Sequence, residues 1–116
     1  MTNLAQLKCV ACRGGEPQLT ASQVEKFMPQ VPDWQVKEVN GEKRLERLFK
    51  FKDFAESLRF TDKVGAIAEE QGHHPMIVTE YGRVTVGWWT HAIRGLHQND
   101  FIMAARTDQL LAERVG

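Results

Sequence analysis

An Asn-Gly pair with a candidate strand on each side is the feature that most limits how this chain can fold. Asn40-Gly41 separates residues 34–39 from residues 43–51. Asn-Gly readily adopts the positive backbone angles of a tight turn, so the two segments are predicted to form a β-hairpin. The second strand alternates imperfectly, because Arg47 falls on its apolar face and Leu48 on its polar face.

A second hairpin is predicted further along the chain. Residues 76–81 and 83–89 are candidate strands that turn at Tyr81-Gly82. One face of the later strand alternates cleanly and carries Val84, Val86 and Trp88. Trp88 and Trp89 therefore fall on opposite faces, and we expect both in the core or at an interface.

Helical segments precede and follow these hairpins. A short helix is predicted from about residue 20 to residue 28, because Pro29 disfavours helical backbone in the residue before it. Asp53 can cap a long helix that runs to about residue 70, and a last helix is expected over residues 98–114. Apolar side chains spread over half or more of the long helix, which favours a contact with another subunit.

The element order α-β-β-α-β-β-α predicts an α+β fold, with a four-stranded antiparallel sheet and helices packed on one face. A chain of 116 residues suits one domain, and 42% hydrophobic with 26% charged residues is the balance of a folded globular protein. We place this domain at residues 20–116. Residues 1–19 contain many turn formers and no sustained periodicity, so they are predicted to form a flexible N-terminal arm.

The arm carries both cysteines, Cys9 and Cys12, in a C-x-x-C motif. A structural zinc site needs four ligands, which one chain does not supply at the usual spacing, although a dimer could pool two pairs. A thioredoxin-like redox site requires the motif between a strand and a helix, whereas here it leads into Arg13-Gly14-Gly15. We therefore interpret the motif as two thiols on a mobile segment.

Charge and hydropathy exclude two broad classes of partner. Lys plus Arg and Asp plus Glu both number 15, so no overall positive field favours direct nucleic-acid binding. No stretch approaches the ~20 apolar residues of a membrane helix, and no leader is recognised. The expectation is a cytoplasmic protein without membrane or nucleic-acid partners.

Three of the four histidines, His73, His74 and His91, fall at predicted element junctions. An imidazole titrates near pH ~6.5, so histidines gathered at loop ends can donate or accept protons at neutral pH. A metal site built from these histidines and Glu69 is the rival interpretation. Its geometry is awkward, because adjacent histidines diverge and no i, i+4 histidine pair of the H-E-x-x-H type occurs. We therefore expect no metal at these residues.

The spacing of these residues carries a resemblance. Glu69-x-x-x-His73-His74-Pro75 is followed by Tyr81, His91 and Asp100, and the whole pattern resembles the signature of the pterin-4a-carbinolamine dehydratase family. The likeness extends to Trp34 and to the Phe49–Phe54 segment, and covers about residues 20–114. Where many members carry Gly-Leu-Thr before the last helix, this chain has Gly95-Leu96-His97. We expect His97 to cap that helix less well than threonine would.

The resemblance implies the dehydration of 4a-hydroxytetrahydropterins to quinonoid dihydropterins, which recycles the cofactor of aromatic amino-acid hydroxylases. This reaction requires no metal or redox cofactor, so none is expected. It implies that His73, His74 and His91 are catalytic, with His73 as the principal acid or base, His91 opposite it and His74 mainly orienting the pterin. Substrate-binding roles are implied for Glu69, Pro75, Trp34 and Asp100.

Local chemistry allows other roles for three of these binding residues. Glu69, one helical turn before His73, could instead hydrogen-bond an imidazole. Asp100 could favour the N-terminus of the last helix through the backbone dipole, and Trp34 could belong to the core.

The family also suggests a homodimer or homotetramer and two alternative functions. One is a pterin-related role in molybdenum-cofactor metabolism. The other is a protein-binding dimerisation cofactor without catalysis, since animal relatives assist a homeodomain transcription factor. The sequence does not separate these substrates and partners.

Overall fold

The computed structural model describes residues 3–9 and 17–112, with three helices and four strands at the expected places. Helix α1 spans Ala21–Phe27, α2 spans Phe54–Gln71 and α3 spans Gln98–Ala112. The strands are β1 (Gln35–Val39), β2 (Glu42–Lys50), β3 (Met76–Glu80) and β4 (Arg83–Trp88). The predicted α+β order is confirmed.

Capping residues begin two of the helices where the sequence indicates. The Thr20 hydroxyl accepts a hydrogen bond from the Gln23 backbone N–H, and Oε1 of Gln23 accepts one from the Thr20 N–H, which forms a capping box. Asp53 Oδ1 accepts from the Glu56 backbone N–H at 2.9 Å and begins α2. At the other end of α2, Gly72 adopts a left-handed conformation with φ 64° and turns the chain towards His73.

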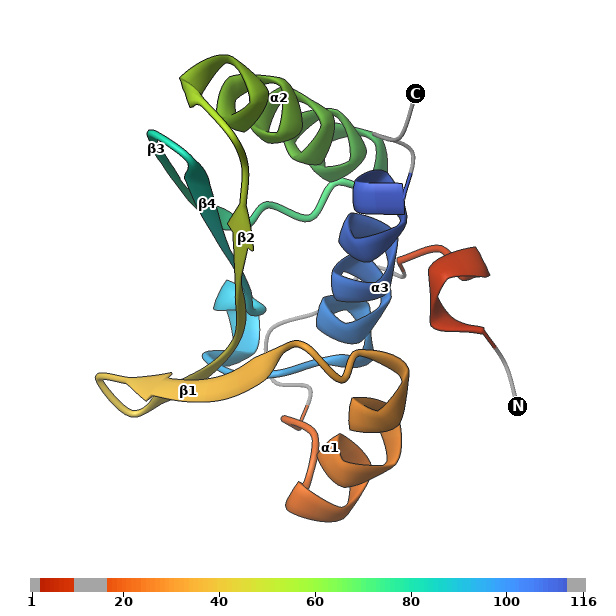
Figure 1. Ribbon diagram of the computed structural model, residues 1–116. Helices are drawn as coiled ribbons and strands as arrows, with labels where there is room; N and C mark the ends of the chain where they lie inside the picture. The colour runs from red at the N-terminus through yellow and green to blue at the C-terminus, as the bar shows by residue number, and fades with distance from the viewer. Residues whose placement is uncertain (1–2, 10–16, 113–116) are drawn as a thin grey trace.

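The four strands form one antiparallel sheet in the order β1-β2-β4-β3. Both hairpins pair as predicted, and the central pairing of β2 with β4 joins them. Figure 1 shows α2 and α3 on the same side of the sheet; none of the described helices packs on its other face, here called the uncovered face. The prediction of helices on one face is confirmed.

The imperfect alternation of β2 has a structural reason. Arg47 lies on the helix-facing side with Leu45 and Phe49, where its guanidinium donates to Asp108 Oδ1 of α3 at 2.7 Å. Leu48 points to the uncovered face and is 46% exposed. At position 47, where the alternating pattern predicts a hydrophobic side chain, the chain has an arginine that forms an ion pair with α3.

The start of the expected flexible arm packs against the domain, which corrects the prediction for these residues. Residues 3–9, here called the N-terminal strap, include a 3-10 turn at Leu4–Gln6, and Leu4 is 1% exposed. Figure 1 shows this turn on the side of α3 that faces away from the sheet. Burying a leucine side chain contributes about 1.5–3 kcal/mol, which outweighs the absence of regular structure around it. Cys12 lies outside the described residues.

Cys9, the last residue of the strap, has a half-buried thiol close to α3. Burial raises the pKa of this thiol to about 11, Arg106 partly opposes the rise, and the Asp100 carboxylate adds to it. Because only the thiolate reacts, we expect iodoacetamide at pH 8 to modify Cys9 about a hundredfold more slowly in the folded protein than in urea. A Cys12→Ser variant followed by mass spectrometry isolates this rate. Equal rates with and without urea would contradict the expectation.

Candidate active site

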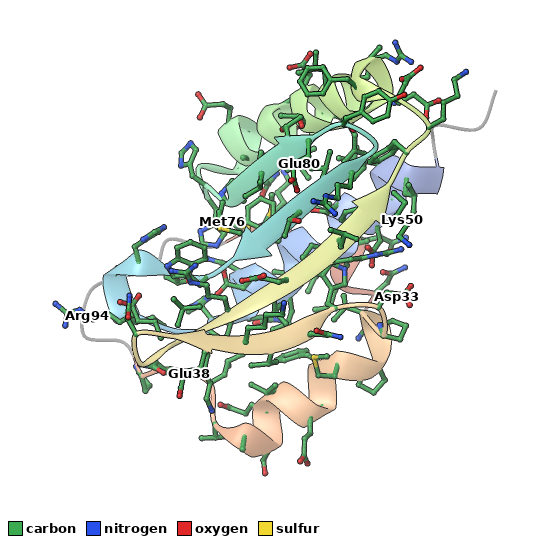
Figure 2. All side chains as sticks on the ribbon, turned by 60° about the vertical axis from the view of Figure 1, so that its left-hand side comes forward. Asp33, Glu38, Lys50, Met76, Glu80 and Arg94 are labelled. Carbon is green, nitrogen blue, oxygen red and sulfur yellow. The ribbon has the colours of Figure 1, made fainter. Side chains whose placement is uncertain are left out.

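The sheet brings the segment of His73 and the segment of His91 to the same end of one hairpin. His73 precedes β3, and His91 follows β4. These strands are antiparallel, with Met76 opposite Gly87. Figure 2 shows Arg94, the residue after the 3-10 turn at His91–Ile93, beyond the Met76 end of β3. The loop before β3 and the loop after β4 therefore leave the sheet as neighbours.

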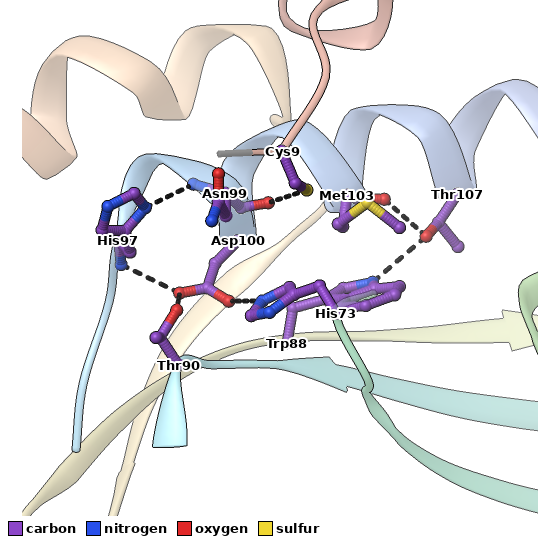
Figure 3. Close-up of polar contacts among 9 residues, drawn as sticks. All are labelled: Cys9, His73, Trp88, Thr90, His97, Asn99, Asp100, Met103 and Thr107. Atoms are coloured by element: carbon purple, nitrogen blue, oxygen red, sulfur yellow. Dashed lines mark hydrogen bonds and ion pairs between the residues drawn. The ribbon is translucent and has the colours of Figure 1, made fainter. Parts of the chain in front are cut away.

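A buried carboxylate at the start of α3 lies at the centre of this region. Asp100 is 0% exposed, and its Oδ1 lies 2.6 Å from His73 Nε2. Its Oδ2 accepts from the Thr90 hydroxyl and from the His97 backbone N–H, each at 2.9 Å. Figure 3 shows this arrangement. One carboxylate thus links the residue before His91 to His73 and caps α3.

The partners of Asp100 fix the tautomer of His73. Oδ2 of Asp100 already accepts two hydrogen bonds, an ionised carboxylate can only accept, and a helix N-terminus stabilises its negative charge. His73 Nε2 therefore carries the proton and donates it to Asp100. Among the described residues, Nδ1 of His73 has no hydrogen-bond partner, so it remains able to accept a proton from a bound molecule.

The His73 ring is also held by an aromatic surface. It stacks on Trp88, with ring centroids 5.7 Å apart and an angle of 15° between the planes. Trp88 is 0% exposed, and its Nε1 donates to Thr107 of α3 at 3.1 Å. Only 13% of the His73 side chain is exposed. Stacking and the Asp100 contact together hold the imidazole in one orientation.

His74 and His91 lie in more open surroundings. Nε2 of His74 lies 2.5 Å from Oε2 of Glu69, and the two side chains are 63% and 77% exposed. The ring of His91 packs on Trp89 at 4.8 Å and is exposed. Glu69 therefore contacts an imidazole, as the sequence allowed. The partner is His74, which diverges from His73 towards a different carboxylate.

Arg44 is an unexpected neighbour of the aromatic residues at this end of the sheet. Its guanidinium lies 3.9 Å from the centroid of Trp89, in a cation–π contact on the uncovered face. Within residues 3–9 and 17–112, Nε of Arg44 is buried without a hydrogen-bond partner. Trp89 therefore contacts both a cation and the exposed ring of His91.

Trp34 lies in the core and not beside the imidazoles. It is 2% exposed, and its Nε1 donates to Asp108 Oδ1 at 2.9 Å. Asp108 lies eight residues after Asp100, which is about 12 Å along a helix. The substrate-binding role implied for Trp34 thus has no support from its surroundings. Pro75 is partly exposed and follows His74 directly.

Asp108 joins Trp34 to Arg47, which predicts an effect on stability. Burial raises the pKa of the Asp108 carboxyl, and the Trp34 hydrogen bond and the Arg47 charge offset only part of the rise. In Arg47→Met the carboxylate loses its cation, so we expect the free energy of unfolding to fall by about 1–3 kcal/mol at pH 7.

The loss of unfolding free energy in Arg47→Met should become smaller as the pH falls through the raised pKa of Asp108, because a protonated carboxyl no longer needs a cation. Urea unfolding at pH 7 and pH 5 measures both effects. Asp33→Asn is the matched control: Asp33 is an exposed partner of Arg47 at 3.6 Å, and its loss should cost about 0.5 kcal/mol or less. An Arg47→Met protein as stable as the parent at pH 7 would refute this account of Asp108.

Sequence reasoning did not identify Thr90 and Trp88 as parts of the site, and it expected a weak cap at His97. His97 caps α3 through its ring, because Nδ1 accepts from the Asn99 backbone N–H at 3.0 Å. The weaker cap expected relative to threonine stays a prediction. The position of Thr90, directly before His91, was the available signal for its role.

Three further findings bear on the kind of site and of protein. Among the described residues, no three His, Cys, Asp or Glu side chains are grouped closely enough to hold a metal ion. A shallow hollow on the uncovered face of the sheet contains no histidine and is lined by Asp33, Gln35, Lys37, Glu46, Arg47, Leu48 and Thr85. None of the described helices is long and apolar enough to cross a membrane.

Comparison with known proteins identifies the family. The model of the pterin 4 alpha carbinolamine dehydratase family matches residues 17–110. A protein of that family name from Nitrosococcus oceani is 57% identical over 111 residues, which is 96% of this chain and 98% of the relative. One from Syntrophotalea carbinolica is 54% identical over 96% of this chain and 99% of the relative. This chain therefore belongs to the pterin-4a-carbinolamine dehydratase family.

Two solved structures share the fold. A transcriptional coactivator/pterin dehydratase from Brucella melitensis has a TM-score of 0.73 and 32% identity, over 81% of this chain and 98% of the other. A pterin dehydratase-like protein described as a RuBisCO assembly factor in the alpha-carboxysome has a TM-score of 0.57 and 26% identity, over 67% and 88%. The family fold therefore appears in proteins described by quite different activities.

Proposed function

We propose that this protein dehydrates 4a-hydroxytetrahydropterin to quinonoid dihydropterin and water, with His73 as the central catalytic residue. The observation that carries the proposal is the 2.6 Å contact between His73 Nε2 and the buried Asp100 carboxylate. This contact leaves Nδ1 as a proton acceptor. When Nδ1 takes a proton, the carboxylate stabilises the resulting imidazolium.

The proposed reaction divides two proton transfers between imidazoles. Nδ1 of His73 accepts the proton of pterin N5 while the C4a–O bond breaks and a C4a–N5 double bond forms. Free hydroxide is a poor leaving group because water has a pKa of about 15.7, so an acid protonates the departing oxygen. We assign that role to His91 and an orienting role to His74, held by Glu69. The step loses one water and changes no oxidation state.

The proposal is tested by following the absorbance of 4a-hydroxytetrahydropterin as it decays, with and without the purified protein. We expect the protein to accelerate the decay at micromolar concentration or below, with water and quinonoid dihydropterin as products. A decay no faster than in buffer would refute the proposal.

Assistance to another protein without catalysis is the second candidate function. The alpha-carboxysome neighbour supports it, because that protein is described as an assembly factor. The His73–Asp100 pair favours catalysis in this chain, since a buried carboxylate beside an imidazole contributes nothing to a distant binding surface. If the protein binds one partner protein and does not accelerate pterin dehydration, the second candidate is favoured.

We also propose that the protein forms a homodimer or homotetramer. Phe54 and Leu58 of α2 are each 44% exposed, and Val78 of β3 is 42% exposed. Large apolar side chains that share an exposed helix face are typical of subunit contacts. Light scattering that shows a monomer at micromolar concentration would contradict this proposal.

A further inference from the structure

The N-terminal strap contacts both elements that carry the His73–Asp100 pair. The backbone N–H of Cys9 donates to Gln71 Oε1 at 3.0 Å, and Gln71 is the last residue of α2, two positions before His73. On the other side, Arg106 of α3 donates through Nε to the Leu7 carbonyl at 2.9 Å. The strap is therefore hydrogen-bonded to the end of α2 and to α3.

A third contact joins the strap to the residue before Asp100. The thiol of Cys9 lies 3.9 Å from the backbone carbonyl of Asn99, the residue before Asp100. Figure 3 shows Cys9 and His73 on different sides of the first turn of α3. One short segment thus contacts the last residue of α2 and the first turn of α3.

The distance between His73 and Asp100 depends on how these two elements are held together. The two residues are 27 positions apart, and Gly72 has already turned the chain out of α2 before His73 begins. A hydrogen bond weakens steeply when its atoms separate beyond about 3.2 Å, so a shift of less than 1 Å at the end of α2 would release the imidazole. Anything that fixes Gln71 against α3 consequently fixes His73.

We propose that the N-terminal strap positions the catalytic histidine, and that Gln71 is the positioning residue through which it acts. The strap lies before residue 17, where the family match begins. The kinetic part of the inference rests on the proposed function. The geometric part concerns only the His73–Asp100 contact.

The chain offers a matched pair of glutamines for the test. Gln71 accepts from the strap at Cys9, and Gln30 accepts from the strap at the Leu4 N–H, at 2.9 Å. Gln71→Leu and Gln30→Leu each remove one acceptor from a strap N–H, and only the first lies near His73. Gln71→Glu retains the acceptor oxygen and is the conservative variant.

We expect Gln71→Leu to lower kcat by roughly tenfold to a hundredfold with little change in KM, as a small misplacement of a catalytic group does. Gln30→Leu and Gln71→Glu should stay within about twofold of the parent. Urea unfolding of the two leucine variants measures their stabilities, which should be similar. Gln71→Ala replaces Gln71→Leu if the leucine variant does not fold.

A spectroscopic readout separates this inference from the proposed function. The proton on His73 Nε2 is hydrogen-bonded to a buried carboxylate, so it should give a slowly exchanging downfield resonance in nitrogen-edited NMR spectra. We expect Gln71→Leu to broaden or move that resonance and Gln30→Leu to leave it unchanged.

If the parent protein proves inactive on pterins while the resonance responds only to Gln71→Leu, the proposed function fails and the positioning inference stands. An unchanged resonance in Gln71→Leu, or an equal change in Gln30→Leu, would overturn the inference.

Discussion

Replacing His73 with alanine is expected to lower kcat for pterin dehydration by roughly 10²–10⁴-fold, the range of a general acid or base. The fold should persist, because the His73 side chain is partly exposed and contacts the intact surfaces of Trp88 and Asp100. Some stability should be lost, since Asp100 then has one donor fewer; about 1–3 kcal/mol is expected for a buried polar group. The decay of 4a-hydroxypterin absorbance measures the rate, and urea unfolding measures the stability.

His74→Ala is the control for His73→Ala. The neighbouring imidazole is exposed and contacts the exposed Glu69, so its loss should raise KM more than it lowers kcat. Imidazole added to the solution should restore part of the rate of His73→Ala, because the alanine leaves a ring-sized space between Trp88 and the carboxylate. A His73→Ala enzyme that keeps more than about a tenth of the parental kcat would remove His73 from the catalytic role.

The sequence predicted those parts of the fold that depend on neighbouring residues. The two turns that Asn40-Gly41 and Tyr81-Gly82 indicate, and the caps at Thr20 and Asp53, are set by local backbone preferences. The order of the strands depends on the pairing of β2 with β4. In the sequence these two strands are separated by α2 and β3. Nothing local in either strand specifies that pairing.

Long-range contacts also explain why the N-terminal strap was predicted to be flexible. Its turn has three residues and no periodicity, and its partners Gln71 and Arg106 lie 62 and 99 positions away from the strap residues that they bind. Leu4 is buried because its turn packs against α3, and the sequence around Leu4 carries no information about α3. Local sequence therefore predicts such a short segment to be flexible, although residues far away in the sequence bury its side chains.

The site shows the same division between spacing and geometry. The pattern from Glu69 to Asp100 indicated which residues to consider, and the structure brings Asp100 and His73 into contact through the end of α2 and the start of α3. Thr90 and Trp88 complete the surroundings of His73 but carry no titratable group, so the only signal was the position of Thr90 directly before His91. Trp34 was considered because of the family pattern alone, and Asp108 holds it in the core.

Asp100→Asn should be nearly as damaging to catalysis as His73→Ala, although it removes no atom that touches substrate. The carboxylate accepts from His73, from Thr90 and from the His97 N–H. An asparagine has one acceptor oxygen and one NH₂ group. If the oxygen keeps the two donors on the Oδ2 side, the NH₂ group faces Nε2 of His73.

An NH₂ group opposite Nε2 reverses the tautomer of His73. Nε2 must then accept, and the ring proton moves to Nδ1, the nitrogen that takes the substrate proton in the proposed mechanism. We expect kcat to fall by about 10²-fold or more, as replacing the carboxylate of a histidine–aspartate pair by an amide does in serine proteases. Nitrogen-15 NMR of His73 measures the tautomer directly, and added imidazole should not rescue this variant.

Asp108→Asn provides the matched control, because Asp108 is a partly buried carboxylate on the same helix that also accepts from a ring N–H, that of Trp34. It lies in the core away from His73, so its amide should leave kcat within about twofold while lowering stability. An Asp100→Asn enzyme with the parental rate would show that the buried carboxylate serves α3 alone. A lower rate with the proton still on Nε2 would mean that the charge of Asp100, and not the tautomer that it fixes, is what His73 requires.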